Sequence, residues 1–165
     1  MSTVLSNHWS EALYRASDRA ISHEAGTSRH LRKFLRNTTP SVSIDQAYEE
    51  CLSSLGDAFE EASRQNWDGY GAEPVSDATV ARALTFLDLL PTAVPSPDIS
   101  PHPDGELAFE WFLGPRRLLT VSIDESGRLS YAALFGQARL HGVEFLFDTL
   151  PDPIALALRR LYARE

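Results

Sequence analysis

The chain of 165 residues has little cysteine and no long apolar run. Its only thiol, Cys51, has no second cysteine to pair with and lacks the companions of a zinc site, which fits a reducing compartment. No stretch approaches the roughly 20 apolar residues of a membrane-spanning helix. The first residues also lack the basic start and apolar run of a secretory signal. We therefore predict a cytoplasmic protein that does not enter a membrane.

Positive charge is also scarce, with 15 Lys and Arg against 23 Asp and Glu and a net charge of −8. Residues 1–40 hold six basic and three acidic side chains, a net charge of +3, whereas residues 41–165 hold nine basic and 20 acidic ones, a net charge of −11. We predict a basic helical arm at 1–40 and an acidic α+β domain at 41–165. Because an acidic domain repels phosphates, broad nucleic-acid binding by this domain is disfavoured.

The arm gathers its cations at the spacing of one helical face: Arg29, Arg32, Lys33 and Arg36. We predict that this face binds a partner, and two interpretations stay open. It docks on an acidic surface of another protein, or it folds back on the acidic domain of its own chain. Nucleic acid ranks behind both, because few aromatic side chains lie close enough to stack on bases. The N-terminal helices are also candidates for self-association.

Helical periodicity precedes strand periodicity along the acidic domain. Apolar residues keep a helical period across 44–64 and again across 77–90, where Ser76 is placed to cap the helix. An extended, proline-rich segment at 91–105 leads to short alternating runs separated by turns, and a helix capped by Asp152 follows. These patterns predict an α+β fold with N-terminal helices, then a three- to four-stranded antiparallel meander, then a C-terminal helix packed on the sheet.

The segment QNWDGYGAEPVSD, residues 65–77, joins the two predicted helices. Its Asp-Gly dipeptide is a turn signal, and its second glycine takes a positive φ at little cost. Trp67 and Tyr70 are large enough to fill gaps beside the helix ends. We interpret the segment as a structural corner rather than a ligand-binding loop. The residues that define this corner motif are Trp67, Asp68, Gly69, Gly71 and Pro74.

Candidates for chemistry gather near the first predicted strand: His102, Asp104, Glu106 and Glu110. Carboxylates and imidazoles that come together bind divalent cations or transfer protons, so these residues would serve a small metal-dependent hydrolase or nuclease. Their spacing matches no established ligand pattern, and neither a phosphate-binding glycine motif nor a nucleophile elbow occurs. Our first expectation is therefore no metal, no cofactor and no catalytic residue.

Two stretches resemble a family of small uncharacterised bacterial proteins. One is NWDGYGAEPVS with the apolar helix after it, and the other is PDGELAFEW with the later GRLSY hairpin. The resemblance covers about residues 64–160 and leaves the basic arm outside. It implies a family without an established activity, and it therefore transfers no catalytic residue. It implies instead a partner-binding component of the antitoxin-like or phage-defence-related kind.

These observations favour a non-enzymatic protein-binding or regulatory module, an inhibitor or accessory protein that engages another protein. The metal-dependent hydrolase or nuclease is one alternative. A second alternative is an inhibitor that mimics the phosphate charge of nucleic acid, which the net charge of −11 over residues 41–165 motivates.

Overall fold

The computed structural model describes residues 44–163, so the predicted arm at 1–40 lies outside the described residues. Two helices, five strands and a last helix follow one another along the described chain. The α+β class is therefore confirmed. The elements are α3 (Ile44–Ala62), α4 (Asp77–Asp88), β1 (Asp98–Pro101), β2 (Leu107–Gly114), β3 (Arg117–Ile123), β4 (Arg128–Phe135), β5 (Ala138–Phe145) and α5 (Asp152–Tyr162).

The starts of α4 and α5 follow different rules. The Ser76 hydroxyl accepts a hydrogen bond of 3.1 Å from the Thr79 N–H, as the sequence predicts for a capping serine. The prediction that Asp152 caps α5 is wrong, because the capping position is Pro151 and Asp152 is the first helical residue. Its carboxylate still lies in the first turn, where the helix dipole favours negative charge.

The sheet has five strands in the order β1-β2-β3-β4-β5, and every neighbouring pair is antiparallel. The prediction of three to four strands is therefore too low. The missed strand, β1, lies inside the proline-rich segment. Because it is an edge strand, it can end at Pro101, whose missing N–H would break a ladder in the middle of a sheet.

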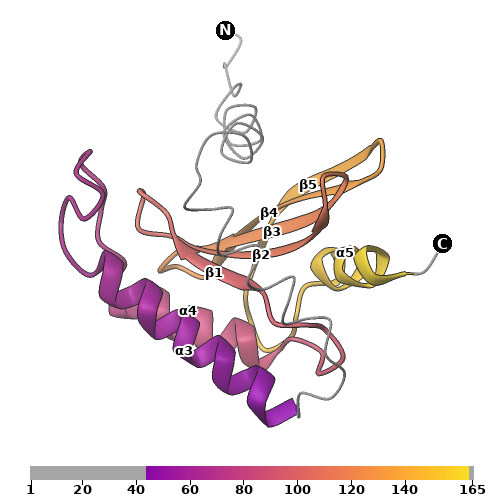
Figure 1. Cartoon of the computed structure of the whole chain (residues 1–165), viewed down its shortest axis with the longest axis horizontal. Helices are drawn as coiled ribbons and strands as arrows, with labels where there is room; N and C mark the ends of the chain where they lie inside the picture. Colours follow the sequence, from indigo (N-terminus) through magenta and orange to yellow (C-terminus); the bar gives the residue numbers. More distant parts are fainter. Residues whose placement is uncertain (1–43, 164–165) are drawn as a thin grey trace, which may run out of the picture. The chain divides into compact units, whose positions relative to one another are not determined.

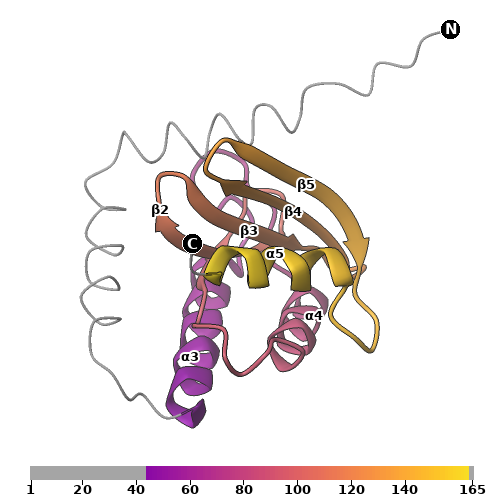
Figure 2. The same ribbon diagram turned by 90° about the vertical axis from the view of Figure 1, so that its right-hand side faces the viewer.

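Helices α3, α4 and α5, the three of the described residues, lie on the same side of the sheet, as both views show (Figures 1 and 2). Helix α3 packs against β1, α4 against β2 and β3, and α5 against β3 and β4, which confirms the prediction of a C-terminal helix on the sheet. Alternate residues of the middle strands form the buried face beneath the helices. They are Leu107, Phe109, Trp111, Leu119, Val121, Ile123, Leu129, Tyr131 and Ala133.

Two hydrogen bonds attach the segment before β1 to this core. The Trp111 indole N–H donates to the Pro95 carbonyl over 2.8 Å, and the Ser96 hydroxyl donates to the Ala47 carbonyl over 3.1 Å. The first bond satisfies the polar atom of a fully buried ring, so the ring contributes apolar area without an unpaired donor. No described helix has the length and apolarity that crossing a membrane requires.

Strand β5 contains a glycine that the packing demands. Gly142 pairs with Tyr131, whose ring lies over it. A Cβ at Gly142 would sit 2.7 Å from Tyr131 Cζ and 2.9 Å from Cε1, distances that real side chains avoid. The Tyr131 ring thus takes the place of the missing side chain on the covered face of the edge strand.

Gly142→Ala should lower the free energy of unfolding by about 1–3 kcal/mol, because the Tyr131 ring has to move out of its packed position. The loss should largely disappear in a Tyr131→Ala background. Gly56→Ala is the matched control, since that position is in α3 and no atom lies within 4 Å of an added Cβ. It should stabilise by about 0.5–1 kcal/mol. Urea unfolding compares the wild type, the three single variants and the Gly142→Ala/Tyr131→Ala double variant, and an equal change at both glycines would contradict the explanation.

Candidate functional site

The corner motif forms the connection between α3 and α4 and is closed by its own hydrogen bonds. The Trp67 indole N–H donates to the Glu73 carbonyl over 3.0 Å, and the ring is half-buried against the core. Tyr70, in contrast, is 94% exposed, so the expectation that it fills a gap is wrong. Its ring projects from a turn in which neighbouring backbone groups are already paired.

Asp68 and Asn66 organise this turn through their side-chain oxygens. Asp68 Oδ1 accepts hydrogen bonds from the Tyr70 N–H (2.7 Å) and the Ala72 N–H (3.1 Å). Asn66 Oδ1 accepts one from the Gly71 N–H over 2.6 Å. The latter glycine has a φ of 93° and Gly69 one of 78°, a region that residues with a side chain rarely adopt. The residue types of the motif therefore have a structural explanation that needs no ligand.

The corner also contacts the turn before β2. The Glu73 N–H donates to the Pro103 carbonyl over 2.8 Å, and a Cβ at Gly105 would lie 3.0 Å from the Pro74 carbonyl oxygen. The two polar segments that the sequence singles out are thus packed against each other, although about 30 residues separate them.

Asp68→Ala should lower the free energy of unfolding by about 1–2 kcal/mol, because the buried Ala72 N–H loses its acceptor. Asp68→Asn keeps an oxygen at the Oδ1 position and should cost less than half as much. Denaturant unfolding followed by tryptophan fluorescence provides the comparison. Equal losses in the two variants would show that the charge, and not the acceptor, matters.

The turn at 102–106 brings together three of the four residues predicted as a chemical cluster. One ligand atom each of His102, Asp104 and Glu106 lies within 4.8 Å of the others. Backbone bonds hold the turn, from the His102 N–H to the Glu106 carbonyl (2.8 Å) and from the Gly105 N–H to the His102 carbonyl (3.1 Å). Glu110 is not in this group, because it lies further along β2 beside Asp98 and Thr120.

A cation already occupies part of this cluster. Arg128 Nη2 lies 3.1 Å from Glu106 Oε1, and Arg128 Nε lies 3.2 Å from Asp124 Oδ2. The Glu106 side chain is only 14% exposed, and the neighbouring Arg128 neutralises its negative charge. The two charges therefore form an ion pair that is partly buried. A metal ion at His102 and Asp104 would have to compete with this arginine for the third ligand.

Asp124 receives several hydrogen bonds from the turn between β3 and β4. Its Oδ1 accepts from the Ser126 N–H (2.9 Å), the Ser126 hydroxyl (2.6 Å) and the Arg128 N–H (3.0 Å). Burial alone would raise the pKa of Asp124, but the bonds from Ser126 and Arg128 together outweigh burial and lower the pKa below 3.8. The carboxylate therefore holds the β3–β4 turn and positions Arg128 for Glu106.

Asp124→Asn should lower the free energy of unfolding by about 1–2 kcal/mol at neutral pH. Since the pKa of Asp124 is lower in the folded protein than in the unfolded one, its charged form stabilises the fold above the unfolded pKa, and this contribution fades as the pH falls through the folded pKa. The two proteins should therefore converge in stability once the pH lies below the folded-state pKa of Asp124.

Thermal unfolding across the acidic range measures this convergence. Asp148→Asn, at an exposed carboxylate in the loop after β5, controls for a general effect of net charge. A deficit of Asp124→Asn that stays constant down to the lowest pH would show that the ionised carboxylate does not stabilise the turn.

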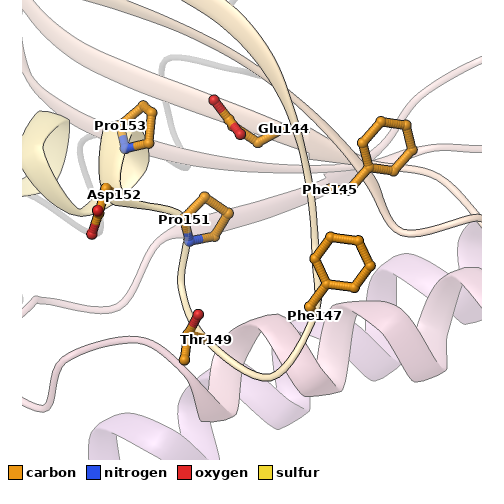
Figure 3. A pocket seen from close by; sticks show the side chains of 7 residues that line it. All are labelled: Glu144, Phe145, Phe147, Thr149, Pro151, Asp152 and Pro153. Atoms are coloured by element: carbon orange, nitrogen blue, oxygen red, sulfur yellow. The ribbon is translucent and has the colours of Figure 1, made fainter.

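A third region of interest lies at β5 and the loop after it. Val143 is 46% exposed, Phe145 51% and Phe147 75%, and we call these three residues the β5 patch. Beside the patch is an open hollow of about 420 Å³ (Figure 3). It is lined by Glu144, Phe145, Phe147, Thr149, Pro151, Asp152 and Pro153.

The sides of β5 differ in chemistry. Glu144 is directed toward the start of α5, where Pro153 lies, whereas Phe145 and Phe147 are directed away from it (Figure 3). Glu144 pairs with the buried Leu129 and so belongs to the covered face of the sheet. Tyr131 lies close to it, and burial, followed by the charge of Glu144, raises the pKa of the tyrosine hydroxyl.

Sequence reasoning did not identify the β5 patch. Part of the signal was present, because the apolar residues Val143, Phe145 and Phe147 alternate with Glu144 and Leu146. In register with β4, Val143 pairs with Ser130 and Phe145 with Arg128, so both lie on the face opposite to the buried Leu129 and Tyr131. The four predicted partner-binding residues of the arm, Arg29, Arg32, Lys33 and Arg36, lie outside the described residues and stay a prediction.

These features define an α+β domain in which three helices cover one face of a five-stranded antiparallel meander. No family model, no curated protein and no solved structure matches the chain. The resemblance drawn from the two sequence motifs gains no support from these comparisons, so function has to be argued from the residues themselves.

Proposed function

We propose that this chain is a non-enzymatic protein-binding module of a regulatory kind, and that the β5 patch is its contact surface. The observation that supports the proposal is the exposure of two neighbouring phenylalanines, Phe145 and Phe147, beside Val143. Large apolar side chains that lie together at a surface are typical of contacts with another protein, because their burial releases water that is ordered around them. Aromatic residues are also enriched at the centres of such interfaces.

The hydrolase or nuclease alternative has less support. Its residues His102, Asp104 and Glu106 do come together, but Arg128 neutralises Glu106, and backbone hydrogen bonds of the turn account for the grouping. The observed hollow lies at β5, and none of the three residues lines it.

The acidic-mimic alternative stays a hypothesis. Its surface would include the solvent-facing side of α3, which carries exposed carboxylates and no basic residue in its last turn. A partner held by charge alone would dissociate as salt rises, whereas a partner held by the β5 patch would not. The exposed carboxylates of α3 are Glu49, Glu50, Asp57, Glu60 and Glu61.

A double variant, Phe145→Glu with Phe147→Glu, should weaken binding of the natural partner at least about tenfold, which corresponds to about 1.4 kcal/mol. The partner is first isolated on the wild-type chain from the native host, identified by mass spectrometry and purified. Dissociation constants are then measured for each variant. Because both side chains are exposed, the double variant should unfold at nearly the wild-type temperature.

Two controls make this test specific. Tyr70→Glu changes an aromatic residue that is 94% exposed on the corner, and it should leave affinity unchanged. The charge reversal of Arg29, Arg32, Lys33 and Arg36 tests the arm. If the arm variant abolishes binding while the Phe145/Phe147 variant binds like the wild type, the β5 patch is not the contact surface.

A further inference from the structure

The outer edge of β5 has backbone groups directed away from the sheet. The Leu146 N–H donates to the Gly127 carbonyl (2.8 Å), and the Asp124 N–H donates to the Arg128 carbonyl (3.2 Å). In an antiparallel pair, hydrogen-bonded and non-hydrogen-bonded residue pairs alternate, and these two bonds show which pairs are bonded. The even-numbered residues of β5 therefore form the backbone hydrogen bonds with β4. The odd-numbered residues direct their N–H and C=O groups outward, and they are Arg139, His141, Val143 and Phe145.

Within residues 44–163, β5 and β1 are the two edge strands, and they differ in how they are protected. Strand β1 has four residues, ends at Pro101 and lies between Pro97 and Pro103. Strand β5 has eight residues, no proline and an unbroken register with β4. Prolines and shortness are the usual means by which proteins prevent an edge from pairing, and β5 has neither.

The chemistry beside this edge indicates what would pair with it. The hollow beside this edge is lined by Glu144 and Asp152 together with Phe145 and Phe147, and no Lys or Arg is among its lining residues. On the face opposite to Glu144, the edge presents Arg139 and His141 in the first half of β5 and Val143 and Phe145 in the second half. An added strand would direct alternate side chains to these two faces. A segment with cations on the side of the hollow and apolar side chains on the opposite side would match these two faces.

A second copy of the chain matches this edge less well. In an antiparallel pairing of two β5 strands, the side chains that the copy places on the covered face are those of Ala138, Leu140, Gly142 and Glu144. None is a cation, and a second Glu144 would add negative charge near the hollow. The charge pattern therefore favours a different, basic partner.

We infer that the outer edge of β5 binds an extended, basic segment of a partner protein by strand addition, with a Lys or Arg of that segment entering the hollow at Glu144 and Asp152. This inference rests on the proposed function and specifies its mode. Main-chain hydrogen bonds to the odd-numbered residues supply affinity, and the hollow supplies selectivity for a cation. Val143 and Phe145 cover the apolar side of the added strand.

The test uses the full-length chain and a capped seven-residue peptide that alternates Val with Lys. Amide hydrogen exchange is measured by NMR with and without the peptide. The amides of Arg139, His141, Val143 and Phe145 should exchange rapidly in the free protein and at least about tenfold more slowly in the complex. The even-numbered amides of β5 should be protected in both states.

Matched variants separate the two parts of the interaction. Glu144→Gln should weaken the Lys peptide about fivefold and leave a Val-Gln peptide within about twofold. N-methylation of the peptide amides that face β5 should reduce binding at least about tenfold, because the donors are lost. Val143→Pro removes one outward N–H of the protein, and Val143→Thr is its control.

Several outcomes would overturn the inference. Odd-numbered amides that are already protected in the free chain would show that the edge is covered, by the same chain if protection is independent of concentration and by a second copy if it is not. Equal binding of the Lys and Gln peptides would remove the role of the hollow. If the natural partner needs Phe145 and Phe147 but leaves the odd-numbered amides unprotected, the proposed function stands and strand addition does not.

Discussion

The apolar side chains on one face of the sheet have to be covered, and three helices cover them from the same side. Most other features depend on this arrangement. The corner motif turns the chain so that α3 and α4 both reach the sheet, and the bond from the Trp111 indole to the Pro95 carbonyl fixes the segment that leads into β1. The coverage also ends short of β5, since α5 packs on β3 and β4. Tyr131 covers that strand instead, and it does so because Gly142 leaves room for its ring.

The corner motif, interpreted from the sequence as structural, and the turn at 102–106, considered there as a candidate metal site, contact each other in the structure. In the corner, the Glu73 N–H donates a hydrogen bond to the Pro103 carbonyl. In the turn, Glu106 forms an ion pair with Arg128, which also contacts Asp124. Carboxylates in tight turns accept backbone hydrogen bonds, and their presence near a histidine is then a consequence of turn geometry. The same residue types would serve a metal, so composition alone does not separate the two roles. The position of Arg128 favours the structural role, because its guanidinium already contacts Glu106, one of the three ligands that an ion would need.

Much of this fold is predictable from periodicity. The helices at 44–62 and 77–88, the Ser76 cap and the alternating strands carry strong local signals. Strand β1 does not, since prolines surround it and its pairing with β2 comes from contacts that no local pattern encodes. The grouping of His102 with Glu106 depends on a turn of five residues and can be predicted from the sequence. The distance of Glu110 from this group and the contact of Arg128 with Glu106 depend on strand register. The β5 patch was missed because alternation alone does not say which face is covered.

The difference between the two edges of the sheet also limits how this domain can assemble. A sheet with two open edges can pair with another strand at each edge, and it can then grow without end. In the sheet formed by residues 98–145, the prolines around β1 protect one edge, and the other edge, β5, is long and free of proline. A complex formed through β5 would therefore contain one added strand for each chain. Strand addition at this edge would then join one partner strand to each described sheet and would leave no second open edge from which that sheet could extend.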